Sequence, residues 1–185
     1  MGHGTCERLW FPRPTSHVPR LMSQSMNAKR ILFVCTGNSC RSVMAERLMR
    51  HVLQRAGIDT VTVESAGVFA VPDMLPTRET LRVLQEVGVD GSDHRARPLT
   101  AAMVEDADLI FVMESFHLDD VLRRQPSAKG KAYLLKAYGL SSTELEPNLN
   151  IPDPIGKPME VYEVCFAEIR EAVERIARSL GVHTG

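Results

Sequence analysis

The sequence of 185 residues is poor in aromatic side chains and has no long apolar run. Its ten aromatic residues are too few for a surface that stacks nucleic-acid bases. No apolar run approaches the ~20 residues that span a bilayer. The 22 basic and 23 acidic residues leave no excess charge to attract a nucleic acid or an anionic membrane. We therefore expect neither nucleic acid nor membrane as a partner.

Cysteine is also scarce, with four residues at scattered spacings. This arrangement does not make a disulfide framework for a domain of this size. Cys6 has no partners at the spacing of metal ligands, so no metal site is expected. The first thirty residues hold no continuous apolar segment, which argues against a secretory signal. We expect a cytoplasmic protein whose thiols stay reduced.

The chain divides into two unequal parts. Residues 1–28 contain three prolines, two histidines and the only tryptophan, without any periodicity, and are predicted to form a flexible extension. Residues 29–182 are long enough for one domain with its own core. In this part, short apolar segments alternate with helical periodicity. Strands are predicted at 30–34, 60–64, 109–113 and 132–135, and helices at 41–57, 77–87, 100–107, 116–124 and 159–180.

Strands separated by helices imply βαβ crossovers. The predicted fold is α/β, a doubly wound four-stranded parallel sheet with helices on both faces. Ligands of such sheets bind beyond the carboxyl ends of the strands, at the topological switch point. The first strand ends at Cys35, so the segment that follows it is the candidate site.

That segment, ILFVCTGNSCRS at 31–42, predicts a strand, a tight loop and the start of a helix. Successive backbone N–H groups and a helix N-terminus then face one spot, which is suited to an anion. A helix N-terminus and a neighbouring cation lower a thiol pKa, so Cys35 is expected to be an activated nucleophile. Arg41 offers a planar fork for two phosphoryl oxygens. Ser42 is placed to donate to the sulfur, while Gly37 and Asn38 suit the turn.

Taken singly, each of these residues has an ordinary explanation. A cysteine at a strand end is usually a small buried apolar side chain, and an arginine at a helix start is usually solvated. Their combination at this spacing is specific.

The reaction also needs an acid for the leaving atom and later a base for water. Asp153, in the segment IPDPIG, is the candidate, because its loop follows the last strand and reaches the same end of the sheet. An ordinary turn aspartate is the equal alternative. Asp73, Asp93 and Asp106 are weaker candidates, better explained as turn or cap residues.

Three motifs together, CTGNSCRS at 35–42, SAG at 65–67 and the Asp153–Pro154 pair, resemble those of the low-molecular-weight protein tyrosine phosphatases. The similarity covers about residues 30 to 180. It implies Cys35 as nucleophile, Arg41 as phosphate binder, Asp153 as general acid and base, and neither metal nor cofactor. It further implies that Cys40 can close a reversible disulfide with the nucleophile. The phosphate-binding residues that it implies are Thr36, Gly37, Asn38, Ser39, Cys40 and Ser42.

Two residues differ from those of the tyrosine-specific members. Ser39 stands where these carry a bulky aliphatic residue, and Ile155 where they carry an aromatic that packs on the phosphotyrosine ring. Bacterial protein arginine phosphatases of the same family resemble CTGNSCRSVMAE and SAGVFA, and carry threonine at the Ser39 position. The expected partner is a phosphorylated protein, with phosphotyrosine or phosphoarginine as the reacting group and a tilt toward phosphoarginine.

Two other functions are weighed. Arsenate reductases share the fold but pass a disulfide to mid-chain cysteines, and no cysteine occurs here between Cys40 and Cys165. A non-catalytic phosphoprotein-binding module would have lost nucleophile or acid, and both are present. Phe69 is either a wall of the substrate opening or a core aromatic. His94 and Arg95 are expected to be a solvated surface pair, with a position near the loop as the alternative.

Overall fold

The computed structural model describes residues 29–141, 143–144 and 147–182; the predicted flexible extension 1–28 lies outside the described residues. It confirms the α/β prediction, with four strands. The strands are β1 Lys29–Cys35, β2 Val61–Gly67, β3 Leu109–Val112 and β4 Ala132–Leu134. The helices are α1 Arg41–Arg55, α2 Arg78–Glu86, α3 Ala101–Asp106, α4 Ser115–Arg124 and α5 Met159–Ser179, with one 3-10 turn, η1 Pro126–Ala128.

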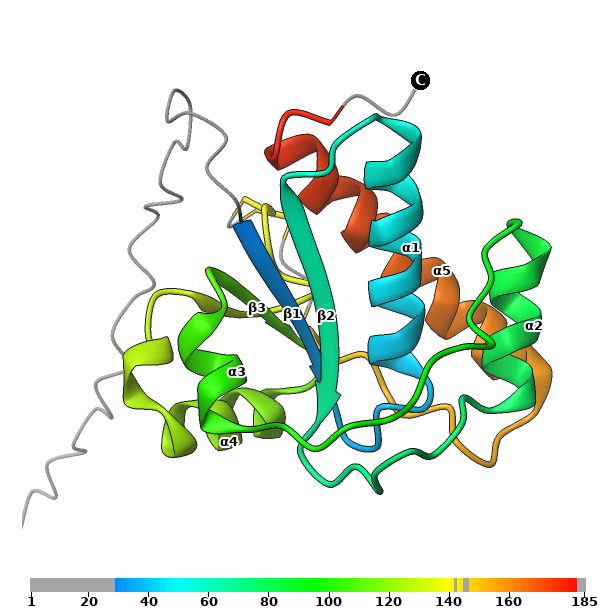
Figure 1. Ribbon diagram of the computed structural model, residues 1–185, viewed down its shortest axis with the longest axis horizontal. Helices are drawn as coiled ribbons and strands as arrows, with labels where there is room; N and C mark the ends of the chain where they lie inside the picture. Colours follow the sequence, from blue (N-terminus) through cyan, green and yellow to red (C-terminus); the bar gives the residue numbers. More distant parts are fainter. Residues whose placement is uncertain (1–28, 142, 145–146, 183–185) are drawn as a thin grey trace, which may run out of the picture.

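The four strands form one parallel sheet in the order β2-β1-β3-β4. The chain adds β2 on one side of β1 and then β3 on the other, so the topological switch point lies between β1 and β3. Helices α1 and α5 cover one face of the sheet, while α3 and α4 cover the other (Figure 1). Helix α2 packs outside, against α1 and α5.

Successive side chains of β1 point to opposite faces of the sheet and pack into the buried cluster on each face. Ile31 and Phe33 face the α1 and α5 side, where they join the larger buried cluster. Leu32 and Val34 face α3 and α4 in the smaller cluster. A strand that is buried on both faces reads as a continuous apolar run, which is why the segment after Arg30 has no polar positions.

The second strand is longer than its pattern suggested. The sequence predicted 60–64, whereas β2 runs on through Ser65 to Gly67 and pairs as far as Cys35. The prediction was wrong at this end because small residues carry a weak strand signal, whereas parallel pairing with β1 and burial hold them in the sheet. The SAG motif therefore ends directly beside the loop that follows β1.

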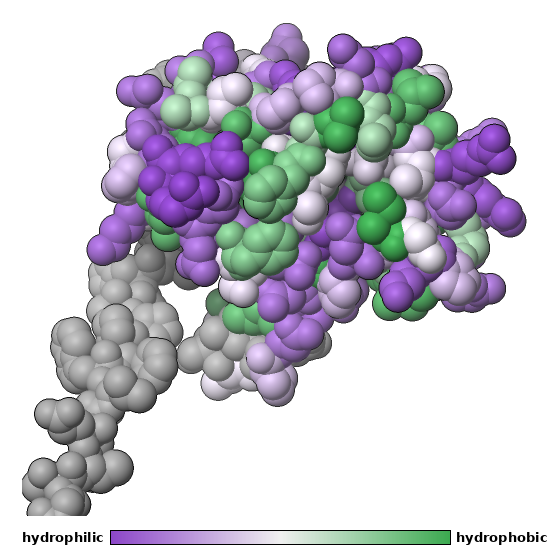
Figure 2. Space-filling model, turned by 90° about the horizontal axis from the view of Figure 1, so that it is seen from below, coloured by the Kyte–Doolittle hydropathy of each residue, from purple (hydrophilic) through white to green (hydrophobic). Residues whose placement is uncertain are grey.

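All four strands run in one direction, so their carboxyl ends share one edge of the sheet (Figure 1). Viewed from that end, the surface mixes apolar and hydrophilic side chains (Figure 2). No helix among the described residues is long and apolar enough to cross a membrane.

Candidate active site

The loop after β1 wraps around the Cys35 sulfur. Cys35 is the last residue of β1, Arg41 is the first of α1, and both are buried. The backbone N–H of Asn38 donates to Cys35 Sγ at 3.3 Å, and Ser42 Oγ lies 3.0 Å from the sulfur. Asn38 Nδ2 already donates to Ser42 Oγ at 2.9 Å, so the Ser42 hydroxyl keeps its own proton for the sulfur. The loop thus supports a thiolate from two directions.

The pKa of Cys35 departs from the sequence-based expectation. Complete burial raises the pKa of the thiol, while the charge of Arg41 and the hydrogen bonds from Ser42 and Asn38 lower it; the net direction is upward. The expectation of a lowered pKa was wrong because the sequence reveals the cation but not the desolvation. The hydrogen-bond donors of the loop are therefore needed to offset burial.

Asn38 holds the loop in shape. Its φ of 53° lies in the left-handed region that asparagine tolerates. Gly37, predicted to supply the conformational freedom of the turn, has no positive φ, so that role falls to Asn38 instead. The fully buried Asn38 amide donates to Ser42 and to Ser65 Oγ at 2.8 Å, and its Oδ1 accepts from the N–H of Arg97 at 3.0 Å.

A buried polar chain extends behind Asn38. The Ser65 hydroxyl donates to Glu46, and His94 Nε2 lies 3.1 Å from the Asn38 carbonyl oxygen. Burial lowers the pKa of His94, although Glu46 opposes this. The prediction of a solvated His94–Arg95 pair was wrong for His94, which is buried against the loop; Arg95 is exposed. A polar sequence such as DHRAR does not reveal that one side chain turns inward.

Gly67 allows β2 to approach the loop. A Cβ at this position would lie 2.6 Å from the Thr36 carbonyl oxygen and 2.9 Å from the Asn38 nitrogen. Both atoms belong to the backbone, which cannot move aside without deforming the loop. The glycine of the SAG motif is thus explained by close contact.

Arg41 is the centre of the site, with its side chain 1% exposed, which excludes the solvated alternative. Its Nη1 donates to Glu114 and, at 2.8 Å, to the Ile151 carbonyl oxygen. Its Nη2 donates to Thr36 Oγ1 at 3.2 Å and to Asp153 Oδ2 at 2.5 Å. Within the described residues its buried Nε has no hydrogen-bond partner. An unpaired buried donor is costly unless a ligand accepts from it, so Arg41 keeps one donor for an anion in the loop.

Asp153 reaches the loop through this contact. Its side chain is 33% exposed, and its Oδ1 also accepts from the N–H of Ile155 at 3.2 Å, as a turn aspartate would. The other aspartates lie elsewhere: Asp93 pairs with Arg47, Asp106 lies near Arg30, and Asp73 sits in a left-handed turn. Of these candidates, Asp153 is the one in contact with Arg41.

Two further residues of the site follow β3, and neither was expected from the sequence. Glu114 pairs with Arg41, and the fully buried His117 contacts Thr36 Oγ1 through its Nε2 at 3.0 Å. Their place in the sequence could have indicated them, because they directly follow β3. Since β3 lies beside β1 in a parallel sheet, its carboxyl end shares the edge that holds the loop.

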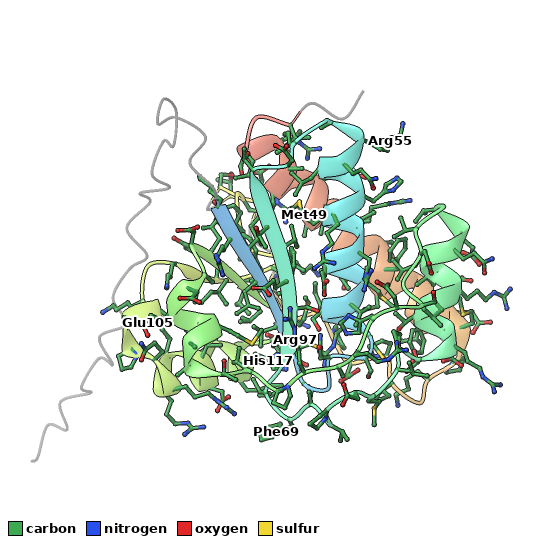
Figure 3. All side chains as sticks on the ribbon, viewed as in Figure 1. Met49, Arg55, Phe69, Arg97, Glu105 and His117 are labelled. Atoms are coloured by element: carbon green, nitrogen blue, oxygen red, sulfur yellow. The ribbon has the colours of Figure 1, made fainter. Side chains whose placement is uncertain are left out.

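The rim of the site is more apolar than its floor. Phe69, at 69% exposed, is not a core aromatic; its backbone N–H donates to the Thr36 carbonyl oxygen at 2.9 Å, which places it beside the loop (Figure 3). Ile155 is 54% exposed, whereas Ser39 is 3% exposed. Cys40 has a free thiol, as has Cys35, so their disulfide stays a prediction. Within the described residues, no three His, Cys, Asp or Glu side chains could together hold a metal ion.

A buried thiol that accepts from Ser42 and Asn38, at the switch point of a parallel sheet and beside a buried guanidinium, defines the class of cysteine-dependent phosphatases. The family model of low molecular weight phosphotyrosine protein phosphatase matches residues 30–184, and the chain belongs to this family.

Relatives from both branches of the family align over most of the chain. It is 38% identical to a protein-arginine-phosphatase of Geobacillus stearothermophilus over 82% of this chain and 95% of that protein. It is 35% identical to the low molecular weight protein-tyrosine-phosphatase Etp of Escherichia coli over 81% of this chain and 93% of that protein. A solved structure of the arginine phosphatase YwlE, a mutant with a phosphorylated active-site serine, matches with a TM-score of 0.74 and 32% identity, covering 82% of this chain and 95% of that one.

Proposed function

We propose that this protein dephosphorylates phosphoproteins through a cysteinyl-phosphate intermediate, with phosphoarginine as its preferred reacting group. The observation that supports the chemistry most directly is the pairing of the buried Cys35 thiol with Arg41, whose Nε–H has no partner among the described residues. Since catalysis needs a free thiol, the proposed setting is the cytoplasm.

The proposed reaction has two displacements at phosphorus. The Cys35 thiolate attacks, the bond from phosphorus to the leaving nitrogen or oxygen breaks, and Asp153 gives that atom its proton. Asp153 then takes a proton from water, whose oxygen attacks phosphorus while the P–S bond breaks. Cys35 leaves as a thiolate that accepts from Ser42 and Asn38, and inorganic phosphate is released. Arg41 and the backbone N–H groups stabilise charge on the phosphoryl oxygens.

Three considerations favour phosphoarginine. Ser39 is small, hydroxylated and buried at the loop, which leaves polar room for a guanidinium. Ile155 offers no aromatic face for a phosphotyrosine ring. Two of the aligned relatives are named protein-arginine-phosphatase, at 38% and 34% identity. Phosphotyrosine is the second candidate, since Phe69 and Phe116 are exposed and could pack on a ring.

The deciding experiment compares kcat/KM on one protein carrying phosphoarginine and one carrying phosphotyrosine. We expect a preference for phosphoarginine, and we expect Cys35→Ser to abolish turnover of both. A clear preference for phosphotyrosine would overturn the substrate assignment, and activity that survives Cys35→Ser would overturn the mechanism.

A variant pair tests the role of Ser39. Ser39→Ile replaces the hydroxyl by apolar bulk and should shift the ratio of kcat/KM toward phosphotyrosine by roughly tenfold or more, the usual effect of mismatched pocket contacts. Ser39→Thr keeps a hydroxyl and serves as the control, with the preference retained. Equal ratios in the two variants would contradict the assigned role.

A further inference from the structure

His117 lies fully buried in the first turn of α4, at the carboxyl end of the sheet (Figure 3). The backbone N–H of Glu114 donates to its Nδ1 at 3.1 Å, and its Nε2 lies 3.0 Å from Thr36 Oγ1. The ring of Phe116 covers it, with 3.9 Å between the ring centroids. The imidazole thus joins the start of α4 to the loop that holds the nucleophile.

The contacts of His117 fix its tautomer. A backbone amide can only donate, so Nδ1 must present a lone pair to Glu114. The neutral ring then carries its proton on Nε2, and Nε2–H donates to Thr36 Oγ1. Burial and the nearby charge of Arg41 lower the pKa of His117 to about 3, so this form persists at neutral pH.

The Thr36 hydroxyl therefore receives two donors. One is His117 Nε2 and the other is Arg41 Nη2, at 3.2 Å. A hydroxyl oxygen has two lone pairs, and both are in use, which leaves its O–H as a donor in the one remaining direction. Across the described part of the chain this proton has no acceptor. Arg41 Nη2 also contacts Asp153, so the hydroxyl and the carboxylate flank the same nitrogen.

We propose that His117 is a positioning residue, which orients the Thr36 hydroxyl to donate a hydrogen bond to an oxygen of the transferring phosphoryl group. This inference rests on the proposed phosphatase function and adds one directed donor to the loop. His117 acts through Thr36 and does not touch the substrate. A donor that is oriented before the substrate arrives stabilises developing charge without reorganisation.

The competing role for His117 is purely structural, as the residue that caps α4. Two variants separate these roles, because asparagine can mimic Nδ1 and glutamine can mimic Nε2. His117→Asn keeps an acceptor for the Glu114 amide and loses the donor to Thr36. His117→Gln keeps a donor at the position of Nε2 and loses the close acceptor at the cap. Their kcat values on p-nitrophenyl phosphate and their urea midpoints are measured together.

If the proposal is correct, His117→Asn lowers kcat roughly tenfold at nearly unchanged stability. His117→Gln should lose stability but retain most of the kcat. The reverse pattern, with His117→Asn fully active, would overturn the proposal.

The hydroxyl itself gives a second test, which holds even if one histidine variant fails to fold. Thr36→Val removes the hydroxyl and Thr36→Ser retains it, so Thr36→Val should lower kcat by a similar factor, and by more than Thr36→Ser does. In the Thr36→Val background, His117→Asn should have less than about a twofold further effect, since coupled residues are not additive. An undiminished tenfold effect in that background would overturn the proposal.

The assay keeps this inference separate from the proposed function. Hydrolysis of p-nitrophenyl phosphate does not depend on a preference for phosphoarginine, so a tyrosine-specific enzyme would still report on His117. Cys35→Ser identifies the opposite failure, because residual turnover there would show that another group performs the chemistry.

Discussion

The contribution of Asn38 to the free energy of unfolding can be measured with the variants Asn38→Ala and Asn38→Gly. Both lose three side-chain hydrogen bonds, to Ser42, Ser65 and the N–H of Arg97. At about 1 kcal/mol net for each bond, the common loss is about 3 kcal/mol. The site is fully buried, so partners left unsatisfied push this figure upward.

The two variants differ in the backbone. At a φ of 53°, alanine carries a strain of about 1–2 kcal/mol that glycine avoids. Glycine in turn costs about 0.4–1 kcal/mol more entropy on folding. We therefore expect Asn38→Gly to be more stable than Asn38→Ala by roughly 0.5–1 kcal/mol, with both well below the wild type.

Urea unfolding followed by far-UV circular dichroism measures these free energies. A loss of less than about 1 kcal/mol in Asn38→Ala would show that the three hydrogen bonds are dispensable. If alanine were the more stable substitution, the left-handed backbone at position 38 would carry no cost, which contradicts the expected order. Activity adds a further check: both variants should turn over more slowly, since Ser42 loses the bond that directs its proton to the sulfur.

Three further predictions concern the acid, the close contact and pH. Asp153→Asn should slow turnover of phosphate esters with poor leaving groups far more than that of activated aryl phosphates, and equal losses in kcat would count against a leaving-group acid. Gly67→Ala should destabilise the fold by about 3 kcal/mol through its contact with the loop backbone. Gly37→Ala is the control, since the nearest atom that its Cβ would meet among the described residues is Ser39 Oγ, at 3.5 Å; similar urea midpoints for the two variants would refute this account. Between pH 6.5 and about 3, the unfolded chain binds a proton at His117 that the folded chain does not. The free energy of unfolding therefore decreases as the pH is lowered, by up to about 1.4 kcal/mol per pH unit. His117→Asn, which lacks this site, should match the wild type at pH 7 and be the more stable of the two at pH 4; an equal stability at both pH values would contradict the lowered pKa.

The residues from Cys35 to Ser42 were predictable because their geometry is local. An apolar run, a turn and a helix start fix where the thiol and the guanidinium lie relative to each other, whatever the rest of the chain does. The parallel sheet was predictable from the alternation of strand and helix patterns. Together they placed the loop at the correct edge of the sheet.

What depends on tertiary packing was not predictable in the same way. The net effect on the pKa of Cys35 depends on its burial, which outweighs the charge of Arg41 and the hydrogen bonds from Ser42 and Asn38. His94 stands in a polar segment, and long-range contacts hold that segment against the loop: the bridge between Gly67 and Pro98 and the hydrogen bond from the N–H of Arg97 to Asn38. Neither the burial of Cys35 nor that of His94 can be predicted from a short stretch of residues.

The order of the strands explains why the site is built from distant segments. Because β3 lies beside β1, the residues after β3 reach the same edge as the loop, and Glu114 contacts Arg41 there. The carbonyl of Ile151 and the carboxylate of Asp153 meet the same guanidinium from the last long loop. Its planar fork contacts all of them at fixed angles, which the single nitrogen of a lysine could not do. In the proposed mechanism, phosphate binding and placement of the acid both depend on this one side chain, so we expect a change at Arg41 to affect both steps of the reaction together.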